Sequence, residues 1–122
     1  MIALGLGFRS QADETALLAA FEAAVSNRCQ PDALATVASK ASAPALLALA
    51  NRLQLPVLAI DEAQLCAQNT PTQSPFVRQR FNTGSVAEAA ALAAAGPGAK
   101  LIVRRVVAAS GMATAAIAES PS

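Results

Sequence analysis

Short apolar runs alternate with helix-like patterns along the first half of the chain, and this alternation constrains the fold more than any other feature. The strand-like runs cover residues 2–8, 34–39 and 56–60. Helix-like patterns follow them at residues 13–27, 44–53 and 61–67. Repeated strand–helix–strand units favour a parallel sheet with helices packed on its faces. We therefore expect an α/β fold, with three α/β/α layers and a mostly parallel sheet.

Capping residues and apolar periodicity define the predicted helices. Ser10 and Asp13 form an N-cap pair for the first helix. Its apolar positions recur at helical spacing at Leu17, Ala20, Phe21 and Ala24. Pro44 suits the first turn of the second helix, and Asp61 can cap the third. The run 56–60 is apolar throughout, which is typical of a central strand covered on both faces.

The segment from Gly84 to Gly96 predicts a helix with small side chains. Ser85 and Glu88 have the spacing of a capping box, in which each side chain bonds the backbone N–H of the other residue. Gly84 lets the chain turn sharply into the helix. The alanines that follow would let the helix approach another backbone, or a large flat ligand, closely.

The chain closes with two further strand-like runs, residues 101–103 and 113–118, joined by a turn at Ser110 and Gly111. A hairpin of this kind adds antiparallel pairing to the otherwise parallel sheet. No internal repeat or low-complexity linker divides the sequence. We therefore expect a single domain over residues 1–122.

Missing residue types and low charge exclude several kinds of site. The chain has no histidine and only 2 cysteines, which argues against Ser–His and Cys–His pairs and thiolate metal sites. Its net charge of +1 argues against nucleic-acid binding driven by charge. No apolar run reaches the ~18 residues that indicate a membrane span, and the first residues lack the basic region of a secretory signal. We therefore expect a cytoplasmic protein with no metal, no cofactor, no nucleic-acid partner and no membrane contact.

Candidate ligand-binding residues gather where the first predicted strand ends. Gly5 and Gly7, at a strand-to-helix transition, could admit an anion to the next helix N-terminus, or could simply permit a tight turn. The full dinucleotide-binding fingerprint is absent. Ligands of open α/β sheets bind beyond the carboxyl ends of the strands. Phe8, Arg9 and Ser10 therefore stand in a position suited to binding.

Three later segments offer groups that could bind an anion. Lys40 follows the second strand and is either directed to the same edge or solvated in a loop. The hydroxyls of Thr70 and Thr72 could donate to a ligand or form turn bonds. Gly84 and Ser85 offer backbone N–H groups, or serve capping alone. If several basic side chains converge there they would suit a polycarboxylate; the candidates are Arg78, Arg80, Lys100, Arg104 and Arg105.

Together these stretches resemble a known family. The resemblance is carried by residues 5–7, 38–40, 44–46, 55–57, 70–72, 74–77, 84–91 and 113–118. They are similar to the CobE proteins and to the C-terminal domain of the CbiG proteins, over nearly the whole chain. The most specific part is Ser-Val-Ala-Glu-Ala-Ala-Ala at 85–91 together with Lys40.

The resemblance implies a role in cobalamin (vitamin B12) biosynthesis. CbiG proteins open a lactone ring on a cobalt-containing precorrin in the anaerobic pathway and release a two-carbon fragment. CobE proteins are stand-alone versions of the C-terminal domain and are associated with the aerobic pathway. This chain departs from many relatives in having Phe8 where they carry cysteine, and Ser42 and Ala43 where they carry an acidic residue. Both departures remove reactive groups and leave binding intact.

The interpretation we favour is binding of a polycarboxylate corrin or precorrin intermediate of the aerobic pathway, in a carrier or accessory role. Other cobalamin-pathway enzymes are candidate partners. Two alternatives stay open: a precorrin lactone-opening hydrolase using Lys40 or a water oriented by Ser85, and a nucleotide-binding or protein-interaction module. The sequence leaves turnover and oligomeric state open. The residues expected to contact the ligand are Gly7, Phe8, Arg9, Lys40, Thr70, Thr72, Gly84, Ser85 and Glu88.

Overall fold

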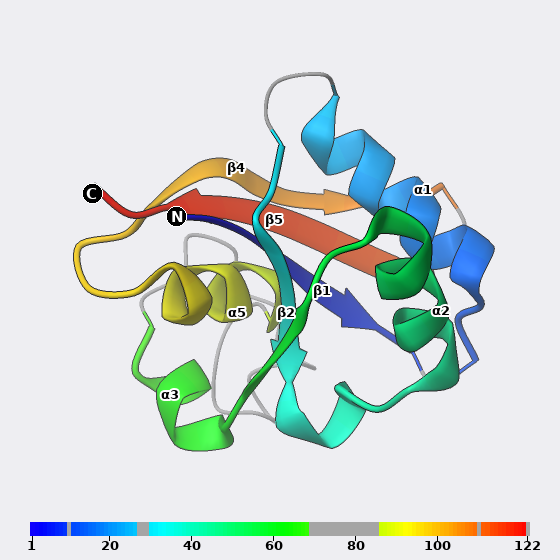
Figure 1. Ribbon diagram of the computed structural model, residues 1–122, viewed down its shortest axis with the longest axis horizontal. Helices are drawn as coiled ribbons and strands as arrows, with labels where there is room; N and C mark the ends of the chain where they lie inside the picture. The colour runs from blue at the N-terminus through cyan, green and yellow to red at the C-terminus, as the bar shows by residue number, and fades with distance from the viewer. Residues whose placement is uncertain (10, 27–29, 69–85, 110, 122) are drawn as a thin grey trace.

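Five strands form one sheet in the order β3–β2–β1–β5–β4. The computed structural model in Figure 1 describes residues 1–9, 11–26, 30–68, 86–109 and 111–121. The strands are β1 (Ile2–Phe8), β2 (Ala33–Val37), β3 (Val57–Ile60), β4 (Lys100–Val107) and β5 (Ala113–Glu119). The helices are α1 (Glu14–Val25), α2 (Pro44–Leu53), α3 (Glu62–Cys66) and α5 (Val86–Ala95), with a short 3-10 turn, η1 (Ala38–Lys40), after β2.

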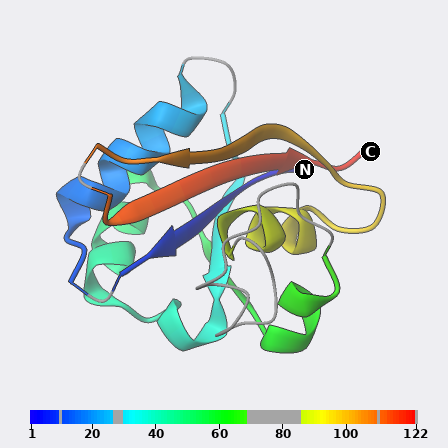
Figure 2. The same ribbon diagram turned by 180° about the vertical axis from the view of Figure 1, so that it is seen from behind.

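The sheet is mixed, with one half parallel and the other antiparallel. β1 pairs with β2 and β2 with β3 in parallel. β5 lies between β1 and β4 and is antiparallel to both, as the view from behind in Figure 2 makes clear. The strand–helix alternation therefore predicted the parallel half correctly, and the closing hairpin supplies the expected antiparallel strands.

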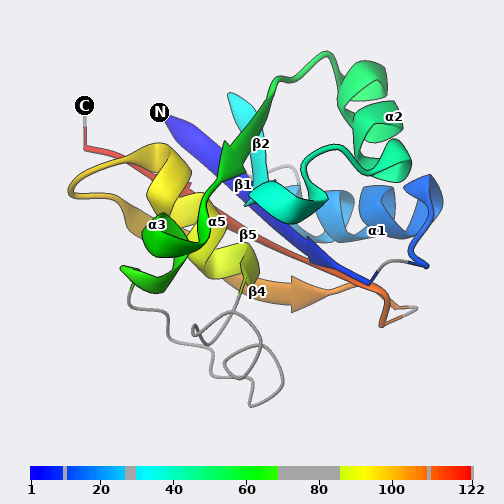
Figure 3. The same ribbon diagram turned by 90° about the horizontal axis from the view of Figure 1, so that it is seen from below.

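Helices cover both faces of this sheet. α1 contacts β1, β5 and β4 and packs against α2, whereas α5 contacts the strands of the sheet and α3. Figure 3 shows α1 and α2 on one side of the sheet and α3 and α5 on the other. The three-layer α/β/α arrangement is thus confirmed.

The predicted starts of α1 and α3 are confirmed in their hydrogen bonds, whereas Ser10, the other half of the predicted N-cap pair, lies outside the described residues. Asp13 Oδ1 accepts from the backbone N–H of Ala16 at 2.9 Å, and Asp61 Oδ1 accepts from that of Gln64 at 2.8 Å. Pro44 occupies the start of α2, where its missing N–H costs no helical bond. The apolar faces point inward, with buried residues Leu17, Ala20 and Ala24 on α1 and Leu46, Leu49 and Ala50 on α2.

The two faces of the sheet are packed with side chains of different size. Successive residues of a strand point to opposite faces. In β1, Leu4 and Leu6 join the leucine-rich core cluster beneath α1 and α2. The alternate positions carry Ala3, Gly5 and Gly7 and face α5. Small residues on both partners therefore let α5 lie close to the strands.

Three of the expected elements differ in detail. The run 56–60 is not a central strand: β3 forms an edge of the sheet, with Ala59 exposed and only Ile60 buried. The fully buried strand is β2, which ends at Val37 rather than Ser39 because the chain turns into η1. The strand expected at 101–103 extends from Lys100 to Val107. None of the described helices is long and apolar enough to cross a membrane.

Candidate functional site

β1 and β2 separate before either strand ends, at the edge of the sheet where the parallel strands terminate. We call this edge the carboxyl edge. The β1–β2 pairing runs from Ala3–Ala33 to Gly5–Ala35. The pairing of β1 with β5 continues as far as Phe8–Ala113. The last three residues of β1, from Leu6 to Phe8, therefore pair with β5 but not with β2.

Side chains bind the carbonyl groups of β1 beyond the point of separation. The hydroxyl of Thr36, which is fully buried, donates to the carbonyl oxygen of Leu6 at 2.8 Å. The ammonium group of Lys40 donates to the carbonyl oxygen of Phe8. A buried carbonyl without a hydrogen bond is costly, so these two donors stabilise the separated end of β1.

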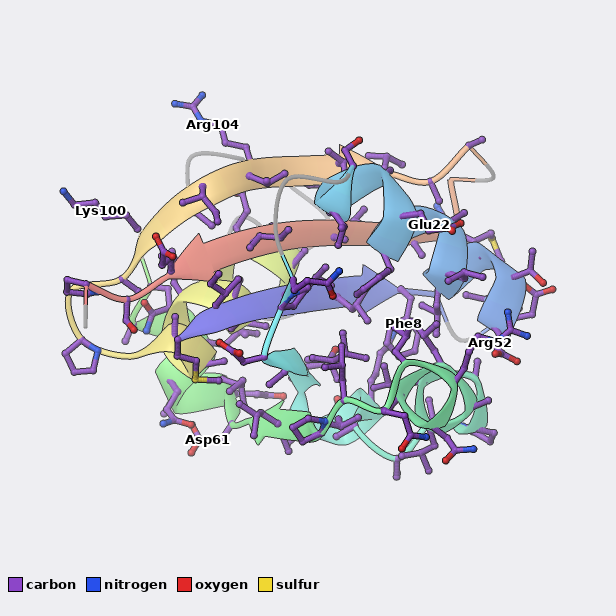
Figure 4. All side chains as sticks on the ribbon, turned by 45° about the horizontal axis from the view of Figure 1, so that its top comes forward. Phe8, Glu22, Arg52, Asp61, Lys100 and Arg104 are labelled. Atoms are coloured by element: carbon purple, nitrogen blue, oxygen red, sulfur yellow. The ribbon has the colours of Figure 1, made fainter. Side chains whose placement is uncertain are left out.

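Lys40 also lies against the aromatic ring of Phe8. Its Nζ is 5.1 Å from the ring centroid, within the range of a cation–π contact. Figure 4 shows Phe8 at the end of β1, near α2. Two separate contacts thus hold the half-buried Lys40 at the carboxyl edge, where the sequence predicted it.

On the other flank of β1, Thr114 and the start of α5 lie against Gly7. The Thr114 hydroxyl donates to the Gly7 carbonyl oxygen at 3.2 Å. A Cβ atom placed on Gly7 would lie 3.4 Å from Val86 Cβ and 3.5 Å from the backbone nitrogen of Ala87. The first turn of α5 is therefore also at the carboxyl edge, beside the strand whose end holds Lys40.

The predicted role of the glycine pair as a turn is wrong. Gly5 and Gly7 lie inside β1, where both pair with β5, and neither has a positive φ. A Cβ on Gly5 would fall 2.0 Å from the Ala87 carbonyl oxygen and 2.6 Å from the Ala91 nitrogen. Gly5 is needed because the backbone of α5 rests directly on the strand, whereas the closest atom to a Cβ on Gly7 would be the Thr114 hydroxyl oxygen at 2.9 Å.

Glu88, predicted as half of a capping box, is fully buried in the first turn of α5. Its Oε2 accepts a hydrogen bond from the backbone N–H of Arg105 in β4 at 2.9 Å. This contact joins α5 to β4, the last strand in the order of the sheet, and was not predicted from the sequence. Ser85, the other half of the capping box, lies outside the described residues.

The structure brings together part of the predicted ligand-binding set. Gly7, Phe8 and Lys40 meet at the carboxyl edge, and exposed Arg9 follows them, with its backbone N–H donating to Met112 O at 3.0 Å. Glu88 is not exposed at this edge: its side chain is fully buried between α5 and β4. The remaining predicted residues fall outside the described part of the chain: Thr70, Thr72, Gly84 and Ser85.

Two of the basic side chains of β4, Lys100 and Arg104, do not lie at this edge. Lys100 begins β4, at the opposite end of the sheet, and Figure 4 shows Lys100 and Arg104 pointing away from Phe8. Arg78 and Arg80 lie outside the described residues. Sequence reasoning missed Thr36 and Thr114 at the site. The available signal was a hydroxyl within an otherwise apolar strand.

The described ranges contain no group of three or more Cys, Asp or Glu side chains that could hold a metal ion. A hollow of about 320 Å³ lies between α3, the end of α5 and the loop that follows it, lined in part by Gln64, Gln68 and Leu92. It includes none of the residues predicted to contact a ligand.

Comparison with known proteins supplies the family. The family model for the cobalamin synthesis G C-terminus matches residues 2–118. The structure is similar to a crystal structure of CobE from the cobalamin biosynthetic pathway, with a TM-score of 0.84 and 30% sequence identity over 97% of this chain and 89% of that one. It is also similar to cobalamin biosynthesis protein chiG from Agrobacterium tumefaciens, with a TM-score of 0.75 and 32% identity over 100% of both chains.

A search of curated proteins gave no significant match. The family model nevertheless spans almost the whole chain, and two structures at 30% and 32% identity share its fold. The chain is therefore a cobalamin biosynthesis protein and belongs to the family of the cobalamin synthesis G C-terminal domain.

Proposed function

We propose that the protein binds a polycarboxylate corrin or precorrin intermediate at the carboxyl edge, in a carrier or accessory role in the aerobic pathway. The observation that carries this proposal is the placement of Lys40. Its ammonium group is held at the end of β1 by the Phe8 carbonyl and the Phe8 ring. A cation beside an aromatic face, at the end of parallel strands, matches a ligand with a broad apolar ring and peripheral carboxylates.

The start of α5 supports the same ligand chemistry. Val86 and Ala87 lie at this edge, against Gly7. The first turn of a helix carries partial positive charge and favours anions. The alanines of α5 are buried against the sheet, and this close packing brings the first turn of the helix to the end of β1.

The contacts of Lys40 favour binding over hydrolysis. As a donor to the Phe8 carbonyl, its Nζ is placed to bind an anion rather than to take up a proton. We therefore rank lactone opening as the second candidate function, after binding. Release of a two-carbon fragment from a lactone-bearing precursor, lost in Lys40→Ala, would reverse that order. The enzymes that make and consume the bound intermediate in the cytoplasm are its proposed partners.

The direct test is a titration of purified protein with hydrogenobyrinic acid, a cobalt-free corrinoid polycarboxylate, followed by its visible spectrum and by calorimetry. We expect saturable binding with a spectral shift. Its a,c-diamide derivative, which lacks two of the carboxylates, should bind more weakly if carboxylate recognition contributes. The absence of any spectral, calorimetric or thermal shift at saturating pigment would contradict the proposal.

A further inference from the structure

We propose that Glu88 is a positioning residue: its buried carboxylate clamps the first turn of α5 to a bulge in β4 and so sets where α5 lies at the carboxyl edge. The effect on a ligand rests on the proposed function. The clamp itself is a statement about the protein alone and is tested separately below.

The burial of Glu88 distinguishes it from the other acidic residues. The chain has 8 acidic side chains, and Glu88 is the one with 0% exposure, the others being exposed or half-buried. Burying a carboxylate is costly unless it is hydrogen-bonded. A helix cap can act at the surface, as Asp13 and Asp61 do. Capping alone therefore does not explain why this carboxylate is buried.

The hydrogen bond from Arg105 explains the burial through the shape of β4. Val103 pairs with Ile117 and Val106 with Ala115, so Arg104 and Arg105 together oppose Ala116. A bulge of this kind leaves an extra residue unpaired in the strand register. The backbone N–H of Arg105 is satisfied by Glu88 Oε2 at 2.9 Å instead. The carboxylate thus accepts the hydrogen bond that a backbone carbonyl of a neighbouring strand would accept in a regular sheet.

The hydrogen bond between Glu88 and Arg105 is connected to the proposed site through the first turn of α5. Val86 and Ala87, in the same turn as Glu88, lie against Gly7. Gly7 precedes Phe8, whose carbonyl oxygen accepts from Lys40. A shift of the first turn of α5 would therefore alter the end of β1 and the group that holds Lys40. Glu88 acts on the site through the helix, without touching the ligand.

Amide hydrogen exchange measured by NMR on ¹⁵N-labelled protein tests the clamp without any ligand. In Glu88→Gln, whose amide oxygen can still accept, the Arg105 amide should exchange within about threefold of the wild-type rate. In Glu88→Ala, it should exchange at least about tenfold faster, while the core amides of Leu4 and Leu34 keep their rates. Glu62→Ala, which alters an exposed first-turn glutamate of α3, is the matched control and should leave Arg105 unchanged.

If Glu88→Ala fails to fold, Glu88→Asp replaces it, because aspartate keeps the charge but is one methylene shorter. Its Arg105 amide should then exchange faster than that of Glu88→Gln. An Arg105 rate unchanged in the Ala or Asp variant would overturn the clamp.

Titration with hydrogenobyrinic acid tests the positioning role at a temperature where each variant is folded by circular dichroism. We expect Glu88→Gln to bind within about threefold of the wild type, and Glu88→Ala to bind about tenfold or more weakly. Equal losses in both variants would overturn positioning in favour of direct contact between carboxylate and ligand. Unchanged affinity in Glu88→Ala would overturn it in favour of a purely structural clamp. If the wild type binds no pigment, the proposed function fails and the positioning role with it, but the exchange rates still decide whether the clamp exists.

Discussion

A Cβ atom on Gly5 would lie 2.0 Å from the carbonyl oxygen of Ala87, a separation that no packed structure tolerates. The nearest obstacles are backbone atoms of α5, including the nitrogen of Ala91 at 2.6 Å. Backbone cannot rotate away as the end of a flexible side chain can. The closeness of β1 and α5 thus depends on this one missing side chain.

Gly5→Ala should therefore destabilise the protein severely. Overpacking a core usually costs ~1–3 kcal/mol, and because the clash is with helix backbone we expect about 3 kcal/mol or more, or loss of folded protein. Urea unfolding followed by circular dichroism measures the effect. Gly7→Ala is the matched comparison and should cost less, since its closest contact is the Thr114 hydroxyl at 2.9 Å, the end of a side chain. Equal costs at both positions would show that the helix can move away.

Gly5 and Gly7 also show which part of the fold the sequence alone does not predict. The apolar run 2–8 predicted β1 correctly, with both glycines inside it. The same glycines also suggest a turn, because glycine is common in turns and no local signal distinguishes a turn from a close helix contact. The helix that requires a glycine at position 5 is more than 75 residues further along the chain. A packing partner so distant leaves no trace in the neighbouring sequence.

Thr36 supplies a second prediction, since its buried hydroxyl satisfies the Leu6 carbonyl at 2.8 Å. Thr36→Val keeps the shape of the side chain and removes the donor. An unsatisfied buried carbonyl costs ~1–3 kcal/mol, so the free energy of unfolding should fall by about that amount. Thr15→Val, at an exposed position of α1, should change it by less than about 0.5 kcal/mol. A Thr36 variant as stable as the Thr15 variant would mean that another group replaces the hydroxyl.

The strand β4 shows why some boundaries escaped prediction. Its apolar start, residues 101–103, indicated a strand, but Arg104 and Arg105 interrupt the pattern before it resumes at Val106. β4 has two register shifts against β5, one between Leu101 and Val103 and one between Val103 and Val106, and the interruption coincides with the second, where two residues oppose one. Periodicity arguments assume regular pleating, so the two arginines at this bulge break the pattern that predicted the strand. The hydrogen bond from Arg105 to Glu88 could not be predicted either, because it depends on this bulge.

Position along the chain predicted more of the candidate site than side-chain chemistry did. Phe8 and Lys40 were placed correctly because both follow strands of the parallel half, whose carboxyl ends share one edge. Lys100 and Arg104 belong to β4, which runs in the same direction as β1 because both are antiparallel to β5, and Lys100 begins that strand at the end opposite to the carboxyl edge. Whether a residue begins or ends its strand, rather than its charge, thus decides which cations can reach the site.

The cap of α1 gives a third prediction. Asp13 Oδ1 accepts from Ala16 N at 2.9 Å, which satisfies one of the free N–H groups of the first turn. Asp13→Ala should lower the free energy of unfolding by about 1 kcal/mol, which corresponds to a fall of roughly 4 °C in the melting temperature of a domain of this size. Glu22→Ala removes an exposed carboxylate from the same helix, shown in Figure 4, and should change the melting temperature little. Equal shifts in both variants would point to net charge rather than capping.

The placement of Lys40 gives the prediction that bears most directly on function. Lys40→Met keeps a long apolar side chain and removes the ammonium group that lies at the end of β1. A charged hydrogen bond contributes ~1.5–3 kcal/mol, so the affinity for hydrogenobyrinic acid should fall about tenfold or more. The remaining affinity should also depend less on salt, since one ionic contact is gone.

Lys100→Met is the matched control, because it makes the same change in net charge at the opposite end of the sheet. Its affinity and salt dependence should stay close to those of the wild type. If the two variants lose affinity equally, the pigment responds to the overall charge of the protein, and the carboxyl edge is not where it binds. A loss confined to Lys40→Met, in protein that melts near the wild-type temperature, would place a ligand carboxylate beside Phe8.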